Sequence, residues 1–272
     1  MARLRYAKSA EQLAQARAAG PGFLEAEVRS IRAIYETSPE LIAAVLPRPL
    51  EPAARPEVHA IVSDVTIHLP GGAIFPLGAG TFGVRCTYQG VEGLYPLTMP
   101  MTTEAAVVGG REIYGEPKKL AEITLTEENG VHVGRITRMG IPYLEVRGRV
   151  IGTHPPVDRV DLAYTFKALP SPPPAVGFDG EPLLCRLEWK HRRKATQVLE
   201  GEVLLEDSPF DPVADLPVRK LVTLELETGA TESNGAVLRS IPGEWLQPFI
   251  HQRYDDPMFP GLDVAVAAEK AA

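Results

Sequence analysis

The sequence predicts an α+β protein whose core is a large, mostly antiparallel β-sheet of barrel-like form, with a few short peripheral helices. Three observations predict this class. About ten segments are rich in β-branched and aromatic residues, which favour strands. Turn-forming residues separate many of these segments at short intervals, as in hairpins. Helical patterns are fewer and shorter than the strand patterns.

Three segments carry helical signals. Residues 9–18 combine alanine and leucine with charged and amide residues, which predicts a short amphipathic helix. A second helix is expected to begin at Ser38, an N-cap residue, with Pro39 at its first position, and to end at Pro47. Residues 103–110 begin like a helix and end in two glycines, so a third short helix is expected there.

The strand segments follow one another with little helical sequence between them. Residues 59–68 are rich in β-branched side chains, and Asn129-Gly130 is typical of a hairpin turn. The expected strands are 27–34, 59–68, 82–88, 121–126, 131–138, 144–151, 160–167, 183–189, 197–206 and 219–226.

Composition is that of a soluble globular protein. Of the 272 residues, 44% are hydrophobic and 23% charged, so one domain over residues 1–272 is expected, with 1–20 and 262–272 at its periphery. The net charge of −7 argues against a nucleic-acid partner, because the general attraction to phosphate is missing. The one basic run, 190–194, is expected to be a solvated strand face. No apolar stretch is long enough for a membrane span.

Residue types that commonly bind metals or cofactors do not occur here with the spacing of a known binding motif. Cys86 and Cys185 are far apart, which indicates the reducing cytoplasm rather than a disulfide framework. The six histidines lack metal-ligand spacing, and no phosphate-binding or dinucleotide glycine motif occurs. We therefore expect a cytoplasmic protein without metal or cofactor.

Residues 110–119, Gly-Arg-Glu-Ile-Tyr-Gly-Glu-Pro-Lys-Lys, carry the strongest chemical signal, because two adjacent lysines lie between apolar stretches. A lysine that attacks a carbonyl must be neutral, and with an ordinary pKa near 10.4 only about 0.04% of it is free amine at pH 7. Burial and a neighbouring cation both disfavour the ammonium form. The pair Lys118-Lys119 therefore predicts a Schiff-base nucleophile.

This segment closely resembles the active-site segment of acetoacetate decarboxylases. Four other blocks are similar to landmarks of that family and occur in the same order, so that the resemblance covers most of the chain. These blocks are 35–50, with an early helix and a Pro-Arg-Pro-Leu exit, 88–95, with a Gly-Val-Glu-Gly turn, 179–185 and 211–218.

The resemblance implies roles for individual residues. Lys118 is the expected nucleophile, and Lys119 the neighbour that lowers its pKa, so that a Lys119→Ala variant is expected to shift the activity profile to higher pH. An arginine on the early strand is expected near the substrate carboxylate. Arg29 is the expected counterpart, although Arg32 is close enough to exchange with it.

The family's Arg-Glu pair corresponds to Arg111 and Glu112, for which a structural ion pair that orients the lysine loop is the alternative. The resemblance also implies a homo-oligomer that acts on a small oxo acid without a cofactor, because the protonated imine is itself the electron sink.

The sequence departs from the family pattern at one acidic residue. Family decarboxylases carry a glutamate in the window that corresponds to residues 77–82, which contain none here. Glu116 is a candidate general acid or base in compensation. Arg85 is a candidate for holding a retained carboxylate, with an ordinary surface role as the alternative, and Tyr254 is a candidate proton donor.

Three functions follow as hypotheses. The first is a lyase that decarboxylates a β-keto acid through a Lys118 imine. The second is an aldolase-dehydratase that condenses or cleaves pyruvate or another 2-oxo acid with an aldehyde and keeps the carboxylate, which the missing glutamate favours. The third is a non-catalytic small-molecule binding protein, against which the intact lysine pair argues.

Overall fold

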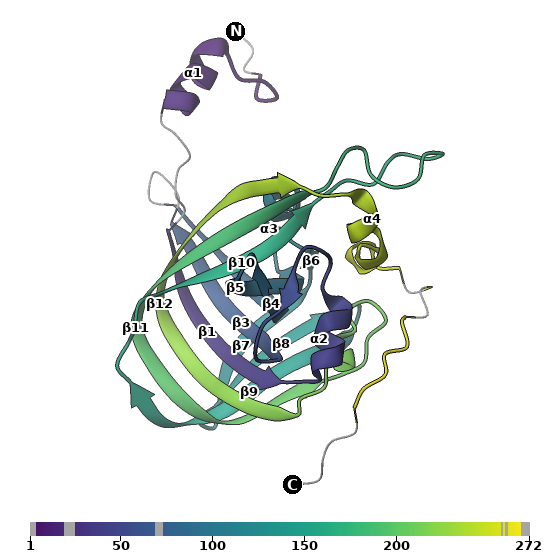
Figure 1. Ribbon diagram of the computed structural model, residues 1–272. Helices are drawn as coiled ribbons and strands as arrows, with labels where there is room; N and C mark the ends of the chain where they lie inside the picture. Colours follow the sequence, from purple (N-terminus) through teal and green to yellow (C-terminus); the bar gives the residue numbers. More distant parts are fainter. Residues whose placement is uncertain (1–3, 19–24, 69–72, 257, 259–260, 268–272) are drawn as a thin grey trace.

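A computed structural model describes residues 4–18, 25–68, 73–256, 258 and 261–267. Figure 1 shows that most of the chain forms one curved β-sheet with short helices around it, which confirms the expected fold class. The helices are α1 (Ala10–Ala18), α2 (Pro39–Val45), α3 (Glu104–Tyr114), α4 (Gly243–Leu246), and the 3₁₀ turns η1 (Val213–Asp215), η2 (Gln247–Phe249) and η3 (His251–Tyr254). None of the helices among the described residues is long and apolar enough to cross a membrane.

The sheet has twelve strands in the described part of the chain. They are β1 (Glu25–Glu36), β2 (Glu51–Pro52), β3 (Glu57–His68), β4 (Ile74–Tyr88), β5 (Val91–Met101), β6 (Lys118–Leu120), β7 (Glu122–Glu128), β8 (Val131–Arg138), β9 (Ile141–His154), β10 (Arg159–Lys167), β11 (Leu183–Leu205) and β12 (Lys220–Ser240).

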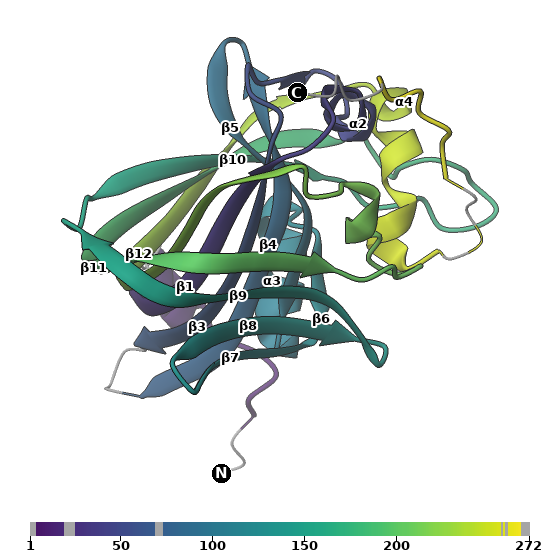
Figure 2. The same ribbon diagram turned by 90° about the horizontal axis from the view of Figure 1, so that it is seen from below.

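Seven of these strands close into a ring in the order β10-β5-β4-β3-β1-β12-β11, because β10 also pairs with β11. The closure between β10 and β5 is short, with Ala163 beside Leu94 as its one register pair. Strands β9, β8 and β7 continue from β11 and fold back beside β3 and β1, outside the ring (Figure 2). The closed ring is the barrel, and the three outer strands form a second layer.

The two faces of β1 show where the hydrophobic core lies. Ile31, Ala33 and Tyr35 have no exposed surface and belong to the main core between the barrel wall and the outer strands. The alternate residues point into the barrel. There the hydroxyls of Ser30 and Ser63 share a hydrogen bond of 2.8 Å. The barrel interior is therefore lined by polar residues on this side.

Several elements are longer than the sequence patterns predict. The expected strands 183–189 and 197–206 form one strand, β11, with a register shift between Arg193 and Ala195 inside the basic run. Strand β5 was not predicted, because Pro96 and Pro100 interrupt its pattern. The helix expected at 103–110 continues to Tyr114.

Candidate active site

Lys118 lies where a helix ends and a short strand begins. Helix α3 ends at Gly115, which adopts a left-handed conformation with φ 68°. A Cβ at this position would lie 2.4 Å from the carbonyl oxygen of Phe166, so close packing on β10 also requires glycine. The chain then enters β6, in which Lys118 pairs in parallel with Met99 of β5. The lysine is thus carried by a hydrogen-bonded strand rather than by a free loop.

The two adjacent lysines point to opposite faces of β6, as neighbouring strand residues do. The Nζ atom of Lys118 lies 3.0 Å from Oε2 of Glu116, and the two side chains are 14% and 9% exposed. Lys119 Nζ donates to the carbonyl oxygen of Phe210 at 2.6 Å. It also pairs with Asp211 at 3.1 Å and with Asp255 at 2.9 Å.

The surroundings of Lys119 bear on the role expected for it. Its charge is neutralised by two carboxylates, one of which, Asp211, is fully buried, and it lies on the face of β6 away from Lys118. Arg138 shares both carboxylates, with Nη1 donating to Asp211 at 3.0 Å and to Asp255 at 2.8 Å. Lys119 therefore belongs to a buried ion-pair cluster, and its expected role beside the nucleophile stays a prediction.

The strand register shows that Lys118 faces the barrel interior. Residues paired across neighbouring strands point to the same face of a sheet. Lys118 shares a face with Leu120, two residues later, and the register pairs connect Leu120 to Met101, Ala79, Ser63 and Ser30. Because Ser30 points into the barrel, Lys118 does so as well.

The alternation of strand residues between the two faces of the sheet also places the two candidate arginines on different faces. Arg29 points outward, where Nη1 donates to the carbonyl oxygen of Leu125 and Nη2 to Nδ1 of His132, both at 3.3 Å. Arg32 points into the barrel, where Nη1 lies 3.8 Å from Glu225 Oε2. The structure therefore corrects the expected position of Arg29, which lies on the wrong face to share a site with Lys118, and places Arg32 on the right one.

Further charges from β10, β11 and β12 gather inside the barrel beside Arg32. Arg159 Nη2 donates to Glu227 Oε2 at 2.9 Å, and Arg193 Nη2 lies 3.0 Å from the same oxygen. Burial lowers the pKa of the Arg193 guanidinium, whose Nε and Nη1 have no hydrogen-bond partner among the described residues. The basic run at 190–194 was expected to be solvated, yet Arg193 is buried, because it pairs with Gly229 on the inner face of the barrel.

Two more candidates line the inner face of β3 and β4. His59 is buried, and burial together with the charges of Arg32 and Arg85 lowers its pKa to about 3, so that the ring is neutral. Arg85 already has two carboxylate neighbours, Glu92 at 3.1 Å and Glu57 at 3.7 Å. These contacts leave Arg85 less suited to hold a substrate carboxylate than the sequence suggested.

The remaining predicted residues lie around the lysine strand. Arg111 Nη1 donates to the carbonyl oxygen of Lys118 at 3.1 Å, whereas Glu112 is exposed and forms no ion pair among the described residues. Tyr254 is 45% exposed, and its ring lies 5.3 Å from the Arg111 guanidinium. The structure therefore brings Arg111 and Glu116 to Lys118 and leaves Glu112 and Tyr254 at the surface.

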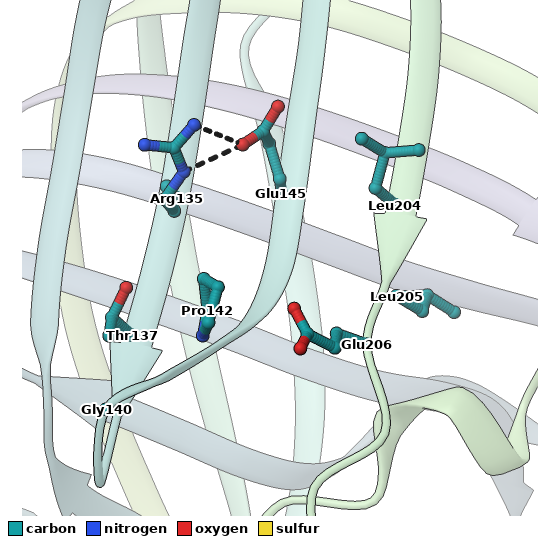
Figure 3. Close-up of a pocket in the computed structure, with 8 residues that line it drawn as sticks. All are labelled: Arg135, Thr137, Gly140, Pro142, Glu145, Leu204, Leu205 and Glu206. Carbon is teal, nitrogen blue, oxygen red and sulfur yellow. Dashed lines mark hydrogen bonds and ion pairs between the residues drawn. The ribbon is translucent and has the colours of Figure 1, made fainter.

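A surface hollow of about 430 Å³ lies elsewhere, on the outer layer (Figure 3). It is lined by Arg135, Thr137, Gly140, Pro142, Glu145, Leu204, Leu205 and Glu206. Arg135 and Glu145 form an ion pair across its rim, and it contains no lysine. Within the described ranges, no group of three histidine, cysteine or acidic residues is placed to hold a metal ion.

The fold and the site define a class of protein, a β-barrel that carries a lysine-glutamate pair on its inner wall. The family model for acetoacetate decarboxylase matches residues 10–239. The chain belongs to the acetoacetate decarboxylase family.

Three proteins are examples of those to which the chain is similar. Acetoacetate decarboxylase of Paraburkholderia xenovorans is 32% identical over 204 residues, covering 69% of this chain and 74% of that protein. The crystal structure of acetoacetate decarboxylase from Legionella pneumophila matches with a TM-score of 0.69 at 21% identity, covering 81% and 88% of the two chains. The enduracididine biosynthesis enzyme MppR complexed with pyruvate matches with a TM-score of 0.66 at 15% identity, covering 81% and 91%. At these identities the two structures show a shared fold.

Proposed function

We propose that the protein is a Schiff-base-forming lyase that acts on a small oxo acid through Lys118. The observation that carries this proposal is the buried pair of Lys118 Nζ and Glu116 Oε2 at 3.0 Å on the inner face of the barrel. A carboxylate within hydrogen-bond reach of an amine can take its proton and return it later in the reaction. Family membership supports lyase chemistry of this kind.

The pair supplies the proton transfers that imine formation requires. Glu116 accepts a proton from Lys118, and the free amine attacks the ketone carbon. The resulting carbinolamine loses its hydroxyl as water when Glu116 returns the proton. The iminium then accepts the electron pair of the carbon–carbon bond that breaks and becomes an enamine. A proton added to the enamine carbon gives the product imine. Hydrolysis of the product imine restores the Lys118 amine.

Arg32 is the residue we propose for the substrate carboxylate, in place of Arg29. One row of the strand register connects Arg32 with Lys118. From Arg32 on β1 it runs through Ile61 on β3 to Thr81 on β4. The β4–β5 register continues it to Met99, which is the partner of Lys118 on β6. β1 lies three strands from β5 in the seven-strand ring. The two side chains therefore extend into the barrel from strands on opposite sides of the ring.

The first candidate reaction is decarboxylation of a β-keto acid of the acetoacetate type, in line with the curated relatives. A second candidate, an aldolase-dehydratase that retains the carboxylate of pyruvate or another 2-oxo acid, is favoured by one observation. The inward positions in the acid-free window of β4 are Leu77, Ala79 and Thr81, so no carboxylate there can destabilise a departing one. The fold shared with MppR, described in complex with pyruvate, is compatible with this alternative.

Borohydride trapping tests the proposal. The protein is reduced in the presence of acetoacetate or of pyruvate, and the modified peptide is identified by mass mapping. We expect a label on Lys118 that is absent in Lys118→Arg and unaffected in Lys194→Arg, whose side chain is 72% exposed. Release of CO2 from acetoacetate supports the first reaction, and trapping of pyruvate without CO2 release supports the second. If neither ketone labels Lys118, the Schiff-base proposal is wrong and the hypothesis of a non-catalytic binding protein is the one that remains.

The setting of the enzyme is also proposed. Cys86 and Cys185 are buried and unpaired, which suits a reducing cytoplasm. We propose a single domain over residues 1–272 that works without a cofactor and assembles as a homo-oligomer. Sedimentation of the purified full-length chain tests the assembly, and activity after exhaustive dialysis against a chelator tests the absence of a cofactor.

A further inference from the structure

The C-terminal segment, residues 251–255, contacts the chain on both sides of Lys118. It consists of η3 (His251–Tyr254) and of Asp255, which has a left-handed backbone with φ 54°. The segment lies beyond residues 10–239, which match the family model. In Figure 1 it follows α4, after the barrel strands are complete. The family match therefore does not cover these contacts, and their role is argued from the geometry of residues 251–255.

Arg253 holds the chain before Lys118. Its Nη1 donates to the carbonyl oxygen of Phe166 at 3.0 Å, and its Nη2 donates to the carbonyl oxygen of Gly115. The guanidinium thus ties the end of α3 to β10. Burial lowers the pKa of Arg253, and its Nη1 and Nη2 atoms donate to carbonyl oxygens rather than to carboxylates.

Arg111 joins this arm to the nucleophile itself. Its Nη1 donates to the carbonyl oxygen of Arg253 and to that of Lys118, both at 3.1 Å. The backbone of the C-terminal segment and the backbone of Lys118 therefore share one hydrogen-bond donor. A shift of the segment would move the donor and remove a constraint on the strand that carries the amine.

Asp255 holds the chain after Lys118. Its carboxylate accepts from Lys119 Nζ at 2.9 Å and from Arg138 Nη1 at 2.8 Å, and it also contacts Arg138 Nη2. Desolvation alone would raise the pKa of Asp255, but hydrogen bonds from Arg138 and Lys119 outweigh it and keep the pKa below its ordinary value. The group is a carboxylate at neutral pH, so the contacts are charge-assisted and among the stronger hydrogen bonds.

We infer that Arg253 and Asp255 are positioning residues for Lys118, which fix the lysine strand from both sides so that the amine meets the substrate carbonyl in a reactive geometry. The inference rests on the proposed Schiff-base function. Displacement of a reacting group by about 1 Å can cost roughly a hundredfold in rate, so contacts that touch no substrate can still control catalysis.

The test compares full-length variants. Asp255→Asn removes the charge that Lys119 and Arg138 share, and Arg253→Gln removes the double carbonyl contact. Asp256→Asn is the matched control, because it makes the same change one residue later, where the carboxylate accepts from the backbone N–H of Met258 at 3.1 Å. Arg253→Lys keeps the charge but can reach fewer carbonyls, so it should fall between Arg253→Gln and the unmodified protein.

Two readouts are measured on each variant. Amide hydrogen exchange, followed by mass spectrometry, reports how firmly residues 110–120 are held and needs no substrate. We expect faster exchange in that peptide for Asp255→Asn and Arg253→Gln, with β3 unchanged. The rate of borohydride-trapped imine formation should fall about tenfold or more, with the ketone concentration for half-maximal rate changing less than about threefold.

Three outcomes are decisive. Unchanged exchange at 110–120, or faster exchange over the whole barrel, overturns the inference. Faster local exchange with an unaltered trapping rate also overturns it, because the segment would then stabilise the strand without positioning the amine. If the unmodified protein traps no ketone at all, the proposed function fails on its own. Local exchange then decides alone whether the segment holds the lysine strand.

Discussion

The Lys118 side chain lies against the α-carbon of Gly110 in helix α3. A Cβ built on Gly110 would come within 2.4 Å of Lys118 Cδ, 2.7 Å of Lys118 Nζ and 2.4 Å of Glu116 Oε2. All three distances are shorter than real Cβ contacts allow. The absence of a side chain at Gly110 therefore creates the space in which the lysine-glutamate pair sits.

Gly110→Ala is expected to displace the pair and reduce turnover at least tenfold, because the added methyl group must occupy the volume of Lys118 and Glu116. The control is Gly109→Ala in the same helix, where a Cβ meets nothing within 4 Å. That variant should keep its activity and gain up to about 1 kcal/mol in unfolding free energy. Equal activities of the two variants would show that the pair does not depend on this space.

Glu116→Gln is expected to lower kcat by roughly a hundredfold to ten-thousandfold, because the amide cannot accept the proton that Lys118 must lose. Glu112→Gln, on the exposed side of the same segment, should retain activity. Steady-state kinetics with the ketone that labels Lys118 provide the measurement. A Glu116→Gln variant of normal kcat would remove the glutamate from the mechanism and leave another group to carry the proton.

Arg32→Gln should raise KM by roughly ten- to a hundredfold, the equivalent of one lost charge-assisted hydrogen bond to a carboxylate. Arg29→Gln should change KM little, because its guanidinium lies on the outer face beside Leu125 and His132. The comparison requires both variants to be folded, which circular dichroism can establish. The reverse ranking of the two KM values would contradict the assignment of Arg32.

Lys119→Met is expected to destabilise the protein by about 3–5 kcal/mol, because it leaves Asp211 and Asp255 to share Arg138 alone in a buried setting. Lys190→Met is the matched control. Lys190 is 48% exposed and lies 3.4 Å from Glu188, so the loss should be below about 1 kcal/mol. Urea unfolding measures both. An unchanged midpoint together with an activity profile moved to higher pH would restore an electrostatic role for Lys119.

His59 should make the protein acid-sensitive. Its pKa of about 3 in the folded state lies below the value near 6.5 of an unfolded chain, so the unfolded state binds the extra proton between these limits. The stabilisation is present above pH 6.5 and is lost as the pH falls towards 3. Urea midpoints at pH 7 and pH 4.5 should therefore differ less in His59→Gln than in the unmodified protein. His68→Gln, at a position that is 54% exposed, should leave the difference unchanged.

Local sequence was sufficient for the lysine segment and for the fold class. Turn residues, β-branched runs and the sequence from Gly110 to Lys119 are local signals, and each corresponds to a described element. Strand β5 and the unbroken length of β11 were not predicted. Prolines interrupt the strand pattern of β5. The length of β11 depends on its pairing with β9, β10 and β12 rather than on its own residues.

Local residue patterns identify Lys118 as the candidate nucleophile and show the resemblance to one family. The side chains that accompany that lysine depend on the fold, which places Arg32 and Arg193 inside the barrel and Arg29 outside, and which brings Asp211 and Asp255 to Lys119. The physical reason is the two-residue period of a strand. A slip of one residue reverses every side chain, and only long-range strand pairing fixes that parity.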